Sequence, residues 1–305
     1  MTDDLDMPRE AAPARAVSPL KAFFWLVRRE LWEHPSAWIA PLAVAGFAVF
    51  THFISAVTIS AAERQAVLAA TSSAKFMVPY SAAIGTIIIL GLVVGALYSL
   101  DALQGERRDR SILFWKSLPV SDLLTVLSKA FIPIVVIPAS ILILAIAANL
   151  LMAPLQSLVW LAQGYDPAEL WGRLDLPYLW GALAMGIPFI ALWYAPFYAW
   201  FLLAAAWARR APILWAMAPF VPILMVEHLV LHNTPSHWAL ERRLAGGILE
   251  PYTVPNTGEK VVWIDHAGQF DWGRVYSLPD LWVGVAMAAL FLFIASRLRR
   301  SRPPL

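Results

Sequence analysis

The sequence predicts an all-α integral membrane protein with six transmembrane helices. Of its 305 residues, 60% are hydrophobic and only 14% are charged. Long uncharged stretches alternate with arginine-containing turns, and a bilayer core of roughly 30 Å requires about 20 residues of helix. Helices also satisfy their own backbone hydrogen bonds in lipid. We therefore expect a single transmembrane domain over residues 36–300, with spans near 37–59, 78–101, 124–152, 179–207, 212–231 and 280–297.

The positions of the basic residues predict the orientation of these spans. With the N-terminus placed inside, 16 of the 23 Lys and Arg residues fall on the inner side and 7 on the outer side. Short cytoplasmic loops of membrane proteins carry such an excess of Lys and Arg. Both termini are therefore expected on the cytoplasmic side, in agreement with an even number of spans.

The segment before the first span divides into two parts. Residues 1–17 mix acidic and basic side chains without an apolar core, which is typical of a flexible cytoplasmic tail rather than a signal peptide. Residues 18–33 place five apolar side chains on one helical face: Leu20, Phe23, Phe24, Val27 and Leu31. Because Pro35 interrupts helical continuity, we expect a helix lying in the membrane interface. A cytoplasmic extension of the first span is the alternative.

Within the spans, individual residues predict packing rather than chemistry. His52 is a lone neutral residue in an apolar helix, which is typical of a packed polar side chain. Gly91 and Gly95 have the small-xxx-small spacing that allows helices to approach closely. Kinks are expected in the third and fourth spans, each of which contains two prolines: Pro133, Pro138, Pro188 and Pro196. A long outer segment, 232–279, precedes the last span.

The hairpin 103–122, between the second and third spans, contains the most informative cytoplasmic residues. Glu106 and Arg110 have the i, i+4 spacing that supports a helix, and Ser121 or Asp122 can cap the next one. Apolar side chains follow the charges, so the segment is either a docking surface or an interfacial anchor. The candidate residues are Glu106, Arg107, Arg108, Asp109, Arg110, Ile112, Phe114, Trp115, Lys116, Leu118 and Pro119.

This hairpin resembles the signature region of permeases in the type-two ATP-binding-cassette (ABC) exporter superfamily. The similar features are an acidic-arginine start, an apolar stretch, a Leu-Pro-Val-Ser turn and a lysine at the next span: Glu106–Arg107, Ile112–Trp115, Leu118–Ser121 and Lys129. The N-terminal Arg28–Leu31, the closing Leu278–Trp282 and the pair Arg299-Arg300 are also similar. The resemblance implies that the hairpin is a coupling helix, which sits in a cleft of a separate ATPase and tilts the spans when ATP binds.

The resemblance also implies the partners. The sequence has no Gly-x-x-x-x-Gly-Lys-Ser/Thr phosphate loop, so ATP and Mg are expected on an ABC-type ATPase subunit, with no cofactor in this chain and no enzymatic activity of its own. A second permease copy, identical or different, and membrane lipids complete the expected assembly, in a bacterial cytoplasmic (inner) membrane. Nothing points to nucleic acid. The aromatic-rich spans fit a lipid-like or amphipathic cargo.

Two other functions are compatible with parts of the sequence. His228 and His232 share a helical face, and with Glu227 they provide the ligand types of a zinc site. A metal-dependent intramembrane hydrolase is therefore an alternative, although polar residues that cap a span explain the same pattern. A non-transporting membrane scaffold is a third hypothesis.

Overall fold

In a computed structural model, the chain is described over residues 18–69, 74–108, 120–226, 243–244, 246 and 272–301, and these residues form helices without any strand. The helices, in chain order, are α1 (Pro19–Glu33), α2 (Ser36–Thr58), α3 (Ala61–Leu68), α4 (Ala74–Arg108), α6 (Asp122–Phe131), the π-helix η1 (Ile132–Val136), α7 (Ile137–Ala162), α8 (Pro167–Trp171), α9 (Leu176–Trp207), α10 (Pro212–Met217), α11 (Phe220–Val226), α13 (Trp272–Tyr276) and α14 (Pro279–Ser301).

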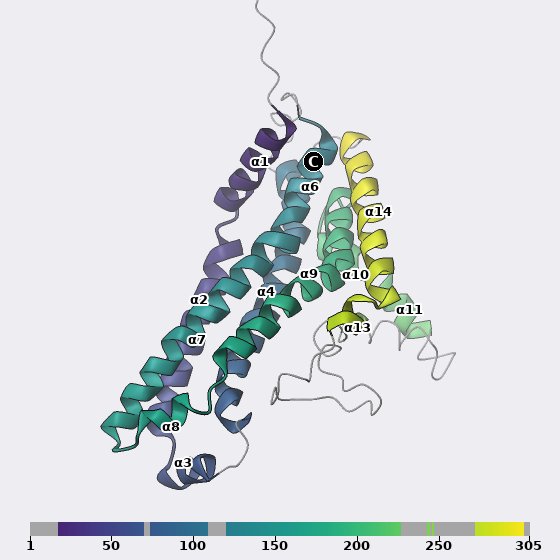
Figure 1. The fold of residues 1–305 in the computed structure, drawn as a ribbon. Coiled ribbons are helices and arrows are strands. Elements are labelled where there is room, and N and C mark those ends of the chain that lie inside the picture. The colour runs from purple at the N-terminus through teal and green to yellow at the C-terminus, as the bar shows by residue number, and fades with distance from the viewer. Residues whose placement is uncertain are drawn as a thin grey trace, which may run out of the picture.

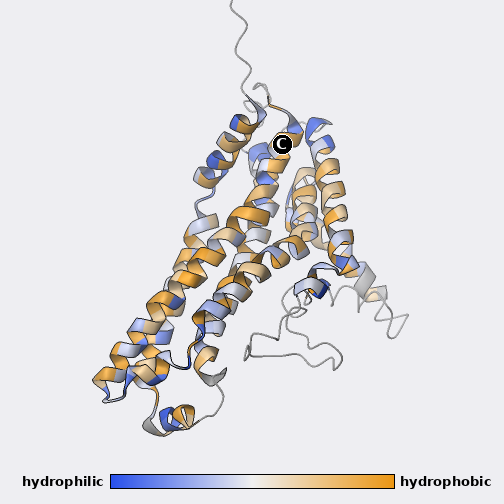
Figure 2. Cartoon of the chain, in the orientation of Figure 1, coloured by the Kyte–Doolittle hydropathy of each residue, from blue (hydrophilic) through white to orange (hydrophobic). Residues whose placement is uncertain are grey.

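Within the described residues, five helical segments are long and apolar enough to cross a membrane: Ser36–Thr58, Phe76–Arg108, Asp122–Ala162, Pro167–Trp207 and Trp272–Ser301. Hydrophobic residues extend along these helices, and hydrophilic ones gather toward their ends (Figure 2). The chain is therefore an all-α protein with the helices of a multi-pass membrane protein, as the composition predicts.

Helix α9 forms the centre of the bundle. In its most apolar window 83% of the residues are buried, against 22% for α2, so α9 is surrounded by protein and α2 lies at the periphery. It packs on α4, α7, α10 and α14. Its Trp193 and Phe189 are fully buried. The exposed side chains of the outer helices are apolar, which is the surface expected to face lipid.

Helix α1 coincides with the segment predicted to be amphipathic. The hydroxyl of Ser18 accepts a hydrogen bond from the backbone N–H of Lys21, and Pro19 occupies the first turn, where its missing N–H has no cost. One face packs on α6. The opposite surface exposes Phe24, Trp25 and Trp32.

The third predicted span is interrupted at its first proline. Ser121 caps α6, because its hydroxyl accepts from the N–H of Leu124 at 3.2 Å. The chain then forms the π-helical turn η1, which contains Pro133, before α7 begins. Because proline cannot donate to the ordinary helical ladder, a wider turn accommodates it. By contrast, α9 continues as one helix through Pro188 and Pro196.

The predicted fifth span, 212–231, differs from the structure. Its described part consists of two short helices, α10 and α11, separated at Ala218 and Pro219. Helix α10 lies beside α9: the rings of Trp207 and Trp215 are 4.8 Å apart, and Trp200 donates its indole N–H to the carbonyl of Ala216 at 3.0 Å. The ring of Phe220, at the start of α11, is 6.3 Å from that of Trp200. The segment therefore runs antiparallel to the end of α9. Prolines within it prevent a continuous helix.

The bundle has two distinct ends (Figure 1). Helices α3 and α8 lie at one end. At the other end lie α1, the start of α6 and the C-terminal end of α14. The C-terminal end of α9 belongs to this second end as well, because Arg107 of α4 donates to the carbonyls of Ala206 and Ala208 at 3.0 and 3.1 Å.

Candidate functional site

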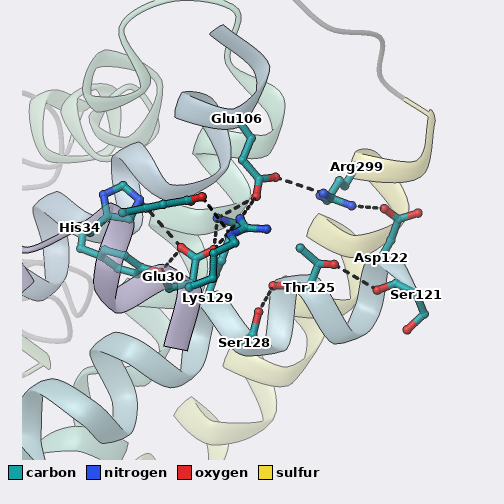
Figure 3. Close-up of polar contacts among 12 residues, drawn as sticks. Glu30, His34, Glu106, Ser121, Asp122, Thr125, Ser128, Lys129 and Arg299 are labelled. Atoms are coloured by element: carbon teal, nitrogen blue, oxygen red, sulfur yellow. Dashed lines mark hydrogen bonds and ion pairs between the residues drawn. The ribbon is translucent and has the colours of Figure 1, made fainter. Parts of the chain in front are cut away.

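Charged side chains from four helices meet at the end of the bundle that holds α1 (Figure 3). We call this group the ionic cluster. It comprises three cations and three carboxylates: Arg29, Lys129, Arg299, Glu30, Glu106 and Asp122. They come from α1, α4, α6 and α14, so the cluster joins helices that are distant in the sequence.

Glu106, near the end of α4, is bound by three cations. One of its carboxylate oxygens lies 2.6 Å from Arg29 Nη2 and 3.1 Å from Lys129 Nζ. The other lies 3.1 Å from Arg299 Nη2. Because Glu106 is only 6% exposed, these contacts replace water as the partners of its charge.

Glu30 and Lys129 form the most deeply buried pair of the cluster. Lys129 Nζ lies 2.8 Å from Glu30 Oε1, and both side chains are fully enclosed. The second oxygen of Glu30 accepts a hydrogen bond from the Tyr98 hydroxyl at 2.9 Å. The ring of His34 packs edge-on against Tyr98, with ring centroids 5.1 Å apart. This pair ties α1 to α6 and, through Tyr98, to α4.

Arg299, near the C-terminal end of α14, bridges the two helices that flank residues 109–119. Its guanidinium binds Glu106, two residues before the last residue of α4, and Asp122, the first residue of α6. A single cation therefore links the end of α4 to the start of α6.

Burial makes the pairing within the cluster essential. An isolated charge in a low-dielectric interior is costly, whereas each of these six side chains has at least one opposite charge within ion-pair distance. Burial alone would lower the pKa of Arg29, but the nearby carboxylates of Glu30 and Glu106 outweigh it, so this pKa is raised above its usual range. The cluster therefore specifies how the helix ends meet, more than it adds net stability.

Of the candidate residues in the hairpin 103–122, the structure describes only the first three. Glu106 and Arg107 were expected on a docking surface, but their side chains are 6% and 4% exposed and engaged inside the bundle. Arg107 caps the C-terminal carbonyls of α9, where a positive charge is favourable. Arg108 is exposed. The remaining candidates lie outside the described residues: Asp109, Arg110, Ile112, Phe114, Trp115, Lys116, Leu118 and Pro119.

Five members of the cluster were not predicted as site residues: Arg29, Glu30, Asp122, Lys129 and Arg299. Each lies in a sequence feature of the permease resemblance, yet nothing in the sequence pairs them. The available signal was charge next to an apolar span, since ionisable residues at such positions are expected to have partners. Sequence alone could not identify those partners, because Glu30 and Lys129 are 99 residues apart.

The metal alternative falls outside the described structure. Glu227, His228 and His232 are not among the described residues. In the ranges that are described, no three His, Asp or Glu side chains are grouped so that they could hold a metal ion.

Comparisons with known proteins give no further identification. No protein-family model, curated protein or solved structure matches this chain.

Proposed function

We propose that this chain is the membrane-spanning permease subunit of an ABC exporter in a bacterial cytoplasmic membrane. It would cross the membrane six times, with both termini in the cytoplasm. A separate ATPase would bind ATP and Mg and dock on the segment 109–119, and a second permease copy would complete the transporter. The observation that carries this proposal is the bridge from Arg299 to both Glu106 and Asp122.

The positions of the helix ends support six crossings. The C-terminal ends of α9 and α14 both lie at the end with the ionic cluster, as the contacts of Arg107 and Arg299 establish. A chain that leaves α9 at this end and enters α14 at the other must return across the bundle. Helix α10 and the first residue of α11 lie along the end of α9 and provide the start of this crossing, the fifth in chain order.

Charge supports the orientation. The cluster end includes Lys21, Arg28, Arg108, Arg297 and Arg300 in addition to the clustered cations. On the surface of α1, the Arg28 guanidinium lies 5.1 and 5.5 Å from the ring centroids of Trp25 and Trp32. Cations and tryptophans together are favoured at a cytoplasmic membrane interface.

The ionic cluster offers a route from a docked ATPase to the spans. In the sequence, the segment 109–119 directly follows α4 and closely precedes α6. Arg299 binds the end of α4 through Glu106 and the start of α6 through Asp122. Lys129 and Arg29 extend the connection to α1. A force on this segment would therefore move four helices together. Glu106 and Arg107 would transmit this force from inside the bundle, and Phe114 and Trp115 would contact the ATPase.

The test co-expresses the chain with each phosphate-loop ATPase of the same organism that has no membrane spans of its own. We expect Phe114→Asp and Trp115→Asp to abolish co-purification of the ATPase, because a carboxylate would disrupt an apolar docking contact. Membrane insertion should be unchanged. Trp32→Asp is the matched control, since Trp32 is 74% exposed at the same end of the bundle and lies outside the proposed contact. ATPase binding that survives both hairpin substitutions would contradict the proposal.

A further inference from the structure

A pocket of about 370 Å³ lies between α2, α3, α4 and α7, at the end of the bundle opposite the ionic cluster. This volume is within the range of sites that bind small molecules, about 300–1,000 Å³. Its lining is mostly apolar but contains several polar side chains, including Thr51, His52, Ser55, Arg64 and Gln156.

Arg64, on α3, brings a buried positive charge to this pocket. Its side chain is 6% exposed. The guanidinium donates to the carbonyl of Ile59 at 3.2 Å and lies 5.2 Å from the ring centroid of Tyr165. Its Nε atom is buried without a hydrogen-bond partner, and among the described residues no carboxylate lies within ion-pair distance. A buried charge without a counterion is costly, so this position favours an anionic ligand.

His52, on α2, lines the pocket as a second buried polar side chain. It is 7% exposed, and its ring packs on Tyr80 with a centroid distance of 5.4 Å. The Tyr80 hydroxyl donates to Gln156 at 2.9 Å. Within the described part of the chain, His52 Nε2 is buried and makes no well-aligned hydrogen bond, although the side chain of Gln156 interacts with the ring. His52 precedes Ile59 by seven residues, so it lies about 10 Å along α2 from the level of Arg64.

The remaining walls determine where a ligand enters. Phe47, Thr51 and Ser55 of α2 and Ala82 and Thr86 of α4 line the pocket and are exposed on the side of the bundle. Both helices are candidate membrane spans. The pocket therefore opens laterally toward the hydrocarbon region, and the buried charge of Arg64 sits at its α3 end. A ligand that enters from lipid must carry an apolar chain, and the arginine selects an anionic head.

We infer that this pocket binds an anionic amphiphile. Its carboxylate or phosphate head contacts Arg64, and its apolar chain follows the groove between α2 and α4 past His52. Charge-assisted hydrogen bonds from arginine to such oxygens are among the strong ones in proteins. The inference does not depend on the proposed function, because it concerns binding by this chain alone, without an ATPase.

The test measures binding to the purified chain in neutral detergent by native mass spectrometry. Oleate and methyl oleate share one chain and differ in charge, and dioleoyl phosphatidic acid provides a phosphate head. We expect one molecule of oleate to bind, at least about tenfold more tightly than its ester, which corresponds to about 1.4 kcal/mol. If oleate binds more tightly than phosphatidic acid, the natural ligand is a free fatty acid. If phosphatidic acid binds more tightly than oleate, the natural ligand is a lipid with a phosphate headgroup.

Variants locate this preference at the pocket. Arg64→Gln should weaken oleate about tenfold and leave methyl oleate unchanged, whereas Arg64→Lys should keep the preference for the acid. Arg173→Gln is the matched control, because Arg173 stacks on Phe76 at the same end without lining the pocket. Ala56→Leu should lower the affinity for both oleate and methyl oleate, because the larger side chain fills the pocket. This variant keeps the charge of Arg64, so it tests the pocket even if Arg64→Gln does not fold.

Three outcomes would overturn the inference. The first is equal affinity of the wild-type chain for oleate and its ester. The second is an equal effect of Arg64→Gln and Arg173→Gln. The third is lipid uptake that does not saturate at one molecule, which would mean that the surface only holds boundary lipid.

Discussion

The two ends of the bundle bury charge in different ways. At one end Glu30, Glu106 and Lys129 are at most 6% exposed, and each binds at least two charged or hydroxyl partners. At the other end Arg64 and His52 are 6% and 7% exposed, yet neither has a carboxylate within ion-pair distance among the described residues. Burial of a polar group thus has two meanings in this chain. Buried charges that are compensated by opposite charges fix helices to one another, and a buried charge without a carboxylate marks a place for a ligand.

The largest effect is expected from Glu106→Gln at the paired end. The substitution leaves three cations with two carboxylates in a buried site. Breaking a buried ion pair in this way costs about 3–5 kcal/mol of unfolding free energy. The melting temperature of the purified chain should fall by on the order of 10 °C.

Glu33→Gln is the control for this substitution. Glu33 also binds Arg29, at 3.2 Å, but its side chain is 44% exposed. Exposed ion pairs contribute only about 0–1 kcal/mol. Equal melting temperatures for the two variants would contradict the assignment of the cluster as a buried, paired site.

A double-mutant cycle on Glu30 and Lys129 should show that the pairing itself matters. Lys129→Met removes the cation from a fully enclosed pair and should be strongly destabilising. Glu30→Gln in the same chain removes the charge left behind, so part of the stability should return. The expected coupling energy is about 0.5–3 kcal/mol, measured by chemical denaturation of the four variants. Strictly additive effects would mean that the two residues act independently.

Between the two ends, the close contacts of α4 can be tested at its glycines. A Cβ atom at Gly91 would lie 2.2 Å from Ile141 Cδ1 of α7, whereas a Cβ at Gly85 would meet nothing within 4 Å. Gly91→Ala should therefore destabilise the bundle by roughly 1–3 kcal/mol, less if Ile141 changes rotamer. Gly85→Ala should be neutral or stabilising by up to about 1 kcal/mol. The reverse order of the two melting temperatures would exclude this packing.

Much of this fold can be predicted from the sequence. Helices α1, α2 and α9 begin and end within about three residues of the predicted bounds, because uncharged length, Pro19 and the turn at Pro35 are local signals. The small-xxx-small pair also predicted close approach, and Gly91 and Gly95 indeed lie against Ile141 of α7 and Tyr198 of α9.

The rest of the structure depends on contacts between distant segments. The span predicted at 212–231 is broken in its described part, because composition measures apolarity but not the effect of closely spaced prolines on helix continuity. The cluster was visible only as separate charges. Arg299 meets Glu106 across 193 residues, and no local pattern encodes such a pairing. That Arg64 has no carboxylate partner among the described residues likewise depends on which side chains the fold brings near it.

The smallest effect is expected at α3, which carries Arg64. The Ser60 hydroxyl and the side chain of Glu63 form reciprocal hydrogen bonds with each other's backbone N–H groups at the start of this helix. Hydrogen bonds from the hydroxyl and the backbone N–H of Ser60 hold the pKa of Glu63 below its usual value. This stabilisation is therefore present above the ordinary Glu pKa of about 4.3 and is lost as the pH falls through the lowered value.

Amide exchange of residues 61–68 measures this effect. The protection factor, which is the intrinsic exchange rate divided by the observed rate, should fall at acidic pH in the wild-type chain. In Ser60→Ala it should already be lower at neutral pH, because the hydroxyl half of the cap is absent. A wild-type protection factor that is independent of pH would show that the capping box does not hold α3 in place.

The difference between the two ends is tested most directly by thermal melting of three chains, with and without oleate. The wild-type chain, Glu106→Gln and Arg64→Gln are compared in the same detergent. We predict that Glu106→Gln melts well below wild type and still gains stability from oleate, as ligand binding to the folded state requires. Arg64→Gln should melt within a few degrees of wild type and gain less from the same oleate concentration, because its affinity is about tenfold lower. A larger destabilisation by Arg64→Gln than by Glu106→Gln, together with an oleate shift that Arg64→Gln retains in full, would contradict the distinction between a paired structural end and a binding end.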